Sequence, residues 1–150
     1  MLKNIHKFLD IKTIFKKSAT IIKKVVTMHK INVIQCFSGA HFLAGYPGAC
    51  SNLHGHNWKV RVQLVSKGTN ELGIAIDFKV VKEKLSNLIQ KLDHKYLNDL
   101  EWFSERNPTS ENIGILIYNE LQKAFKEDGV TVSEVEVWES DNTSVIYCSE

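Results

Sequence analysis

The 150-residue sequence contains no run of 18 or more apolar residues, and its N-terminal segment lacks the uninterrupted apolar stretch of a secretory signal. A helix that spans a membrane needs about 20 consecutive, predominantly apolar residues. The missing run excludes a membrane-spanning segment, and we expect no membrane partner.

Cysteine is scarce and irregularly spaced. The chain has three cysteines, Cys36, Cys50 and Cys148, and no CxxC pair. An odd set without a pattern argues against a disulfide framework and for a reducing compartment. We therefore expect a cytoplasmic protein with free thiols.

The folded part of the chain also lacks an excess of positive charge. The formal net charge is +2, but the first 30 residues hold eight lysines against one acid, Asp10, so the remainder is net acidic. A nucleic-acid-binding domain carries a basic face, and no nucleic-acid partner is expected. The charge distribution predicts a basic N-terminal extension over residues 1–29 and one domain over 30–150.

Three interpretations of residues 1–27 stay open. Lysines are interleaved with apolar residues there in a weakly amphipathic pattern. The segment is a surface or targeting helix, an accessory helix that packs on the domain, or sequence upstream of a true start at Met28.

Hydrophobic periodicity predicts an α+β fold. Alternation of apolar and polar residues is typical of strands, and apolar residues three and four apart are typical of helices. The expected elements are, in order, strands over 31–38, 54–64 and 73–76, helices over 78–92 and 109–125, and a hairpin over 130–147. Asp77 and Thr109 are the expected N-caps of the two helices. Without the short strand over 73–76 the order is ββααββ, which predicts a four-stranded antiparallel sheet with both helices on one face.

Histidines at the start of the second strand carry the strongest chemical signal. Residues two apart on a strand point to the same side, so His54 and His56 project together. His41 follows the strand expected to pair with theirs. Three imidazoles with an open fourth position are typical of a catalytic zinc site. The alternative is that these histidines are polar residues at the mouth of a strand.

Cys50 lies four residues before His54, in a loop rich in glycine. A thiol near Zn²⁺ loses its proton readily, and the thiolate is a competent base or nucleophile. Alternatively, Cys50 is a fourth zinc ligand in a structural site.

Acidic residues and one further histidine lie at the ends of the expected elements. Asp93 directly precedes His94 after the first helix, so the pair forms either a proton relay or a helix C-cap. Glu111 in a helix first turn is explained by the helix dipole, and Glu139 at a strand end is explained by solvent.

Taken together, these segments resemble one family over about residues 30–150. The sequence carries, in the order found in the 6-pyruvoyl-tetrahydropterin synthase superfamily, the motifs CFSGAHFL, GACSNLHGHNW, IDF, LDHKYLN, NPTSEN and WES. Six ordered motifs are highly specific, whereas any one alone is weak. The resemblance implies that His41, His54 and His56 bind a Zn²⁺ cofactor and that Cys50 is the catalytic base.

The resemblance also implies roles for residues that attract little notice by themselves. Asp93 and His94 would form a relay with the base, and Glu139 would belong to the active site. Glu111 would anchor the pterin, because a carboxylate can accept two parallel N–H bonds from its amino-pyrimidinone edge. Thr109 would be a second substrate-binding residue.

The family's fold and assembly follow as expectations. The resemblance implies the tunnelling fold, with subunits that associate as trimers whose sheets close into a barrel. The trimers are typically paired into hexamers. Active sites would lie between subunits and take a small-molecule pterin.

The spacing from Cys50 to His54, together with LHGH and PTSEN, is similar to the bacterial queuosine-pathway branch of the family. The implied reaction is a lyase reaction that converts 7,8-dihydroneopterin triphosphate to 6-carboxy-5,6,7,8-tetrahydropterin and releases acetaldehyde and triphosphate. One alternative is a 6-pyruvoyl-tetrahydropterin synthase, which eliminates triphosphate without carbon–carbon cleavage. Another is a non-catalytic zinc- or pterin-binding module.

Overall fold

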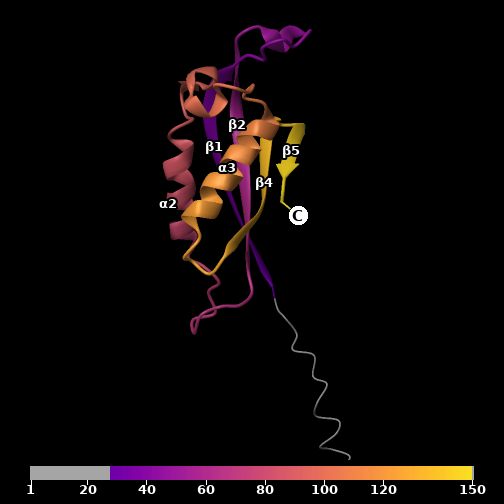
Figure 1. The fold of residues 1–150 in the computed structure, drawn as a ribbon. Helices are drawn as coiled ribbons and strands as arrows, with labels where there is room; N and C mark the ends of the chain where they lie inside the picture. Colours follow the sequence, from indigo (N-terminus) through magenta and orange to yellow (C-terminus); the bar gives the residue numbers. More distant parts are fainter. Residues whose placement is uncertain (1–27, 150) are drawn as a thin grey trace, which may run out of the picture.

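The computed structural model describes residues 28–149 as one sheet with two helices packed on one of its faces (Figure 1). Almost all of the expected basic extension lies outside the described residues. The elements are β1 (His29–His41), β2 (His54–Ser66), α2 (Phe78–Ile89), β3 (Lys95–Tyr96), α3 (Ser110–Ala124), β4 (Thr131–Ser140) and β5 (Thr143–Tyr147). Within this part of the chain, no helix is long and apolar enough to cross a membrane.

The sheet has the strand order β3-β1-β2-β4-β5. β1 and β2 form a long hairpin whose register runs from His29 opposite Ser66 to His41 opposite His54. β4 pairs with β2, and β5 with β4, both antiparallel. These four strands confirm the expected antiparallel set. The limit to four strands was wrong, because the two-residue β3 adds a fifth strand parallel to β1.

The expected strand over 73–76 is also wrong. Residues 71–76 form turns, and the Oδ1 atom of Asn70 accepts hydrogen bonds from the backbone N–H groups of Leu72 and Ile74. A side chain that takes these donors competes with a sheet ladder for them. Ala75 and Ile76 pack against the core without joining the sheet.

Both helices begin at the expected caps. The carboxylate of Asp77 accepts the N–H of Lys79 at 2.8 Å, and the hydroxyl of Thr109 accepts the N–H of Asn112 at 3.3 Å. Helix α2 buries one face, formed by Val81, Leu85, Leu88 and Ile89. Phe78, the first residue of the helix, is apolar but 55% exposed.

The core lies between the helices and one face of the sheet, and that face changes character toward one end. Phe37 and Trp58 are opposite each other on β1 and β2, and both are buried. The next inward position on β2 is His56, opposite Gly39 of β1, and the one after it pairs His41 with His54. The inward face of the β1–β2 hairpin is therefore apolar along most of its length and carries the histidines at one end.

Candidate metal centre and adjoining cavity

Three histidines and a carboxylate converge at the end of the core face. His41 ends β1, His54 and His56 begin β2, and Glu139 lies near the end of β4. One ligand atom from each of the four lies within 4.8 Å of the others. Strand pairing and the period of two bring the imidazoles together, as the sequence predicted.

Backbone carbonyls fix which ring nitrogen of two histidines carries the proton. Nδ1 of His41 lies 2.7 Å from the carbonyl oxygen of Pro108, and Nδ1 of His54 lies 2.7 Å from that of Asn52. Since a carbonyl can only accept, each Nδ1 donates its hydrogen and each Nε2 keeps a free lone pair. Within residues 28–149, the Nε2 atoms of His41, His54 and His56 are buried and have no hydrogen-bond partner.

The electrostatic setting favours the neutral form of His41 and His56. Burial lowers the pKa of His41, and the neighbouring His54 and His56 lower it further, against the hydrogen bond to Pro108 and the charge of Glu139. Burial is also the main reason why the pKa of His56 is lowered. A neutral imidazole with an unshared lone pair is the form that binds a metal.

Glu139 completes the fourth side of the cluster. Its Oε1 lies 3.0 Å from Nε2 of His56 and 3.9 Å from Nε2 of His41. The shorter contact is at ion-pair distance, and Nε2 of His56 makes no hydrogen bond within residues 28–149. Its Oε2 accepts a hydrogen bond from the hydroxyl of Ser110 at 3.2 Å, which fixes the carboxylate from the start of α3. Hydrophobic periodicity did not place Glu139 beside the histidines, and only the family resemblance implied that it belongs to the active site.

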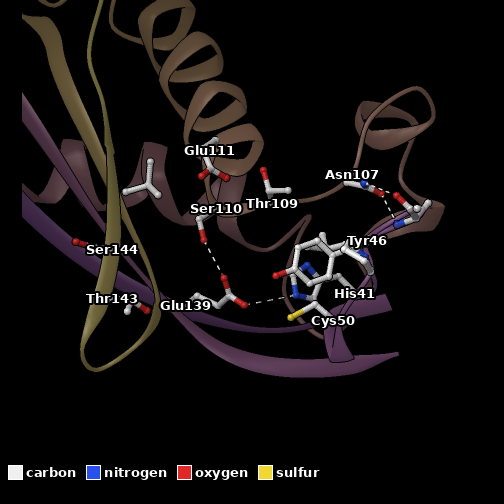
Figure 2. A pocket seen from close by; sticks show the side chains of 15 residues that line it. His41, Tyr46, Cys50, Asn107, Thr109, Ser110, Glu111, Glu139, Thr143 and Ser144 are labelled. Atoms are coloured by element: carbon white, nitrogen blue, oxygen red, sulfur yellow. Dashed lines mark hydrogen bonds and ion pairs between the residues drawn. The ribbon is translucent and has the colours of Figure 1, made fainter. Parts of the chain in front are cut away.

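A cavity of about 600 Å³ opens beside the cluster. It is lined by side chains from four parts of the chain, which Figure 2 shows around one space. Of the residues expected in the site, it brings together His41, Cys50, Thr109, Glu111 and Glu139.

Cys50 reaches this cavity from a loop between β1 and β2. It lies in a 3-10 turn (Ala49–Ser51) and is a partly buried free thiol. The backbone carbonyl of Cys50 accepts the N–H of Leu43 at 2.8 Å, which closes the loop. The group of atoms that meet within 4.8 Å does not include its sulfur.

Asp93 and His94 lie together but outside this cavity. The Oδ1 atom of Asp93 is 2.9 Å from Nδ1 of His94 and accepts the N–H of Ser38 at 2.9 Å. The bond from Ser38 is the main cause of the lowered pKa of Asp93, and the bond from His94 is the second. The pair was expected beside Cys50, but His94 lines a separate cavity of about 540 Å³ together with His56. A single chain does not assemble the expected relay.

Several residues of the site were not singled out from the sequence. Tyr46 and Asn107 line the cavity, and Ser110 holds Glu139. Tyr46 belongs to the glycine-rich loop before Cys50, and Ser110 directly follows Thr109, the expected helix N-cap. The glycine-rich loop beside a candidate reactive cysteine was the available signal for Tyr46.

Comparison with known proteins identifies the same family over the same residues. The family model described as 6-pyruvoyl tetrahydropterin synthase matches residues 30–150. The chain is 39% identical over 119 residues to a 6-carboxy-5,6,7,8-tetrahydropterin synthase of Synechocystis sp., covering 75% of this chain and 88% of that protein. It is 36% identical over 107 residues to the 6-pyruvoyl tetrahydrobiopterin synthase of Homo sapiens, covering 69% of this chain and 72% of that protein.

A solved structure has the same fold. The 6-pyruvoyl tetrahydropterin synthase of Caenorhabditis elegans superimposes with a TM-score of 0.75 at 24% identity, covering 83% of this chain and 98% of the other. At that identity the likeness concerns the fold alone.

Proposed function

The chain belongs to the 6-pyruvoyl tetrahydropterin synthase family, and from that premise we propose that it is a zinc-dependent lyase. Its proposed substrate is 7,8-dihydroneopterin triphosphate, and its products are 6-carboxy-5,6,7,8-tetrahydropterin, acetaldehyde and triphosphate, in queuosine biosynthesis. One observation carries the proposal. Three unpartnered histidine nitrogens converge beside a cavity that also holds a free thiol and Glu111.

The donor set fits Zn²⁺. Catalytic zinc sites combine three protein ligands, commonly histidines or two histidines with a carboxylate, and leave one position for water or substrate. His41, His54 and His56 would hold the ion, and Glu139 lies close enough to be a further ligand or to meet the substrate. When bound there, Zn²⁺ supplies Lewis acidity to oxygen atoms of the substrate side chain.

Cys50 is proposed as the base that removes a carbon-bound proton. Its thiol faces the cavity next to the cluster without joining the converging donors. This arrangement favours a thiolate that acts on the substrate over a fourth ligand in a closed structural site.

Glu111 is proposed as the pterin anchor. It lies in the first turn of α3 and lines the same cavity as Cys50. An ionised carboxylate accepts two parallel N–H bonds from the amino-pyrimidinone edge, and the helix N-terminus stabilises its charge. The pterin would then extend from α3 toward the histidines.

Asp93 and His94 are proposed to complete the site of a neighbouring subunit. His94 lines a different cavity from Cys50 within one chain, so a relay that joins Cys50 to the Asp93–His94 pair requires a second copy. The exposed His94 ring is available to such a copy, since its side chain is 81% exposed. This supports a homo-oligomer, a trimer or a hexamer, with active sites between subunits.

Product identification tests the proposal. The purified protein, loaded with zinc and incubated with 7,8-dihydroneopterin triphosphate, should release acetaldehyde and triphosphate in equal amounts. The test variant is His54→Ala. Its matched control is His29→Ala, at an exposed histidine at the far end of β1. Only His54→Ala should lose zinc and turnover.

Two other outcomes would contradict the proposal. Triphosphate without acetaldehyde, and a pterin that keeps its three-carbon side chain, would assign the pyruvoyl reaction carried by the human relative's name. No turnover, together with an intense thiolate charge-transfer band after cobalt substitution, would assign a zinc- or pterin-binding module with Cys50 as ligand.

A further inference from the structure

Asn107 connects the loop that carries Cys50 to the start of helix α3. Its Oδ1 atom accepts the backbone N–H of Ala44 at 2.8 Å, and its Nδ2 donates to the carbonyl oxygen of Ala44 at 3.0 Å. Figure 2 shows this pair of bonds at the edge of the cavity. One side-chain amide thus satisfies both polar groups of one residue in a segment that has left the sheet.

Asn98 binds Phe42, two residues before Ala44, in the same way. It accepts the N–H of Phe42 at 3.0 Å and donates to the carbonyl of Phe42 at 3.0 Å. Hydrogen bonding to alternate residues is what a neighbouring strand would supply. Beyond His41, the two asparagine side chains therefore supply the hydrogen bonds that a neighbouring strand would otherwise make. They hold the backbone of residues 42–44 in place.

That segment in turn holds Cys50. The N–H of Leu43 donates to the backbone carbonyl of Cys50, while the adjacent Ala44 is bound to Asn107 on the other side. The consecutive residues Leu43 and Ala44 therefore link the backbone of Cys50 to the side-chain amide of Asn107. A shift of one displaces the other.

Asn107 itself is fixed by α3. Its backbone carbonyl accepts the Nδ2 of Asn112 at 2.8 Å and the N–H of Thr109 at 2.9 Å. The next residue, Pro108, supplies the carbonyl that orients His41. Residues 107–109 consequently touch the thiol loop, a candidate metal ligand and the helix that carries Glu111.

We propose that Asn107 is a positioning residue that sets the Cys50 thiol relative to the histidine cluster and the pterin anchor. The inference rests on the proposed function, because the position of Cys50 matters when it acts on a substrate in this cavity. The side chain of Asn107 acts on the loop, whereas its backbone holds α3. Replacing the side chain should therefore move the thiol and leave Glu111 and the histidines in place.

The test replaces Asn107 by Ala in the full chain and compares it with Asn87→Ala, a change on the exposed side of α2. The first measurement is the rate of Cys50 alkylation by iodoacetamide, followed by peptide mass spectrometry. The exposed Cys36 and Cys148 in the same molecules serve as internal references. We expect Cys50 alkylation to accelerate several-fold in Asn107→Ala, with both reference thiols unchanged.

The second measurement separates kcat from KM. A misplaced catalytic group costs up to about 10²-fold in rate, so kcat should fall while KM stays near the wild-type value, because Glu111 is undisturbed. If Asn107→Ala does not fold, Asn107→Asp keeps the acceptor oxygen, loses the donor, and should show the same changes to a smaller degree. Unchanged Cys50 alkylation in a folded Asn107 variant, or an equal change in Asn87→Ala, would overturn the proposal. The alkylation result does not depend on turnover, so it judges Asn107 even if the wild-type protein fails to convert the pterin.

Discussion

Cys50 is the residue whose two possible roles differ most in their consequences. As a base, its thiolate is needed for proton removal and dispensable for metal binding. Cys50→Ala should therefore keep about one zinc per chain and lose turnover by about 10²-fold or more, the usual scale for a general base. Atomic emission and a steady-state assay give the two numbers. Loss of zinc together with a destabilised fold would instead identify Cys50 as a ligand.

Glu111 is expected to act through its charge. Glu111→Gln keeps the shape of the side chain but places an amide donor against the donors of the pterin. Losing a charge-assisted bidentate contact should weaken substrate binding by about 2–4 kcal/mol. The matched control is Glu120→Gln, near the other end of α3 and bonded to Lys123. An unchanged kcat/KM in Glu111→Gln would exclude the anchor role.

The histidine cluster should make the metal-free protein sensitive to mild acid. The pKa values of His41 and His56 are lowered from 6.5 in the folded chain, chiefly by burial. Below that value the unfolded chain binds more protons than the folded chain, so the free energy of unfolding falls as the pH decreases. The urea midpoint of EDTA-treated protein should be lower at about pH 5.5 than at about pH 7.5.

The control for this pH effect is His56→Gln, in which the drop should be smaller. Asp93 does not interfere in this range, because its pKa is lowered from 3.8. A midpoint that stays constant or rises on acidification of the wild-type protein would contradict the cause assigned to the cluster.

The sequence predicted the histidine pair because its geometry is local. Residues two apart on one strand must share a face, whatever the rest of the fold does. The supports of the site are different. The bond from His41 to Pro108 spans 67 positions, and the bond from Ala44 to Asn107 spans 63. Contacts of that range depend on how α3 docks on the sheet, which no local pattern determines.

The helices show the same division at the level of elements. Caps such as Asp77 and Thr109 depend on a few neighbouring residues, and both were predicted correctly. β3 was missed because two residues are too short to show alternation, and its parallel pairing with β1 is decided by where α2 delivers the chain. The apolar run at 73–76 had strand composition, but the side chain of Asn70 engages its backbone donors.

The two caps permit a paired test of what α3 does for the site. Asp77→Ala and Thr109→Ala should each lower the free energy of unfolding by about 1 kcal/mol, the typical cost of losing a cap. Only Thr109→Ala should also raise KM, because Thr109 precedes Glu111 and lines the cavity. Thr109→Ser keeps the capping oxygen and should resemble the wild type in both measurements. An equal rise in KM for Asp77→Ala would show that the effect is general destabilisation.

At the scale of the whole molecule, the helices leave one face of the sheet uncovered (Figure 1). The centre of that face carries a paired charge cluster, in which Arg61 lies 2.8 Å from Glu134 and 2.7 Å from Glu136. These charges are paired with one another and need no second protein surface to cover them. Such a face suits the water-lined interior that the proposed closed barrel of sheets would have.

The proposed assembly predicts that two inactive variants can restore each other. If Cys50 comes from one subunit and His94 from its neighbour, Cys50→Ala and His94→Ala should each form inactive oligomers. The two variants are unfolded, mixed in equal amounts and reassembled. A site is then intact where the subunit that supplies Cys50 is the His94→Ala variant and the neighbour that supplies His94 is the Cys50→Ala variant. Random assembly gives this arrangement in about one quarter of the sites, so activity should return to about that fraction of the wild-type value. The control is a mixture of Cys50→Ala with a Cys50→Ala, His94→Ala double variant, in which no intact site can form. Activity that stays at the level of the separate variants, with mixed oligomers present by native mass spectrometry, would place both residues in the site of one chain.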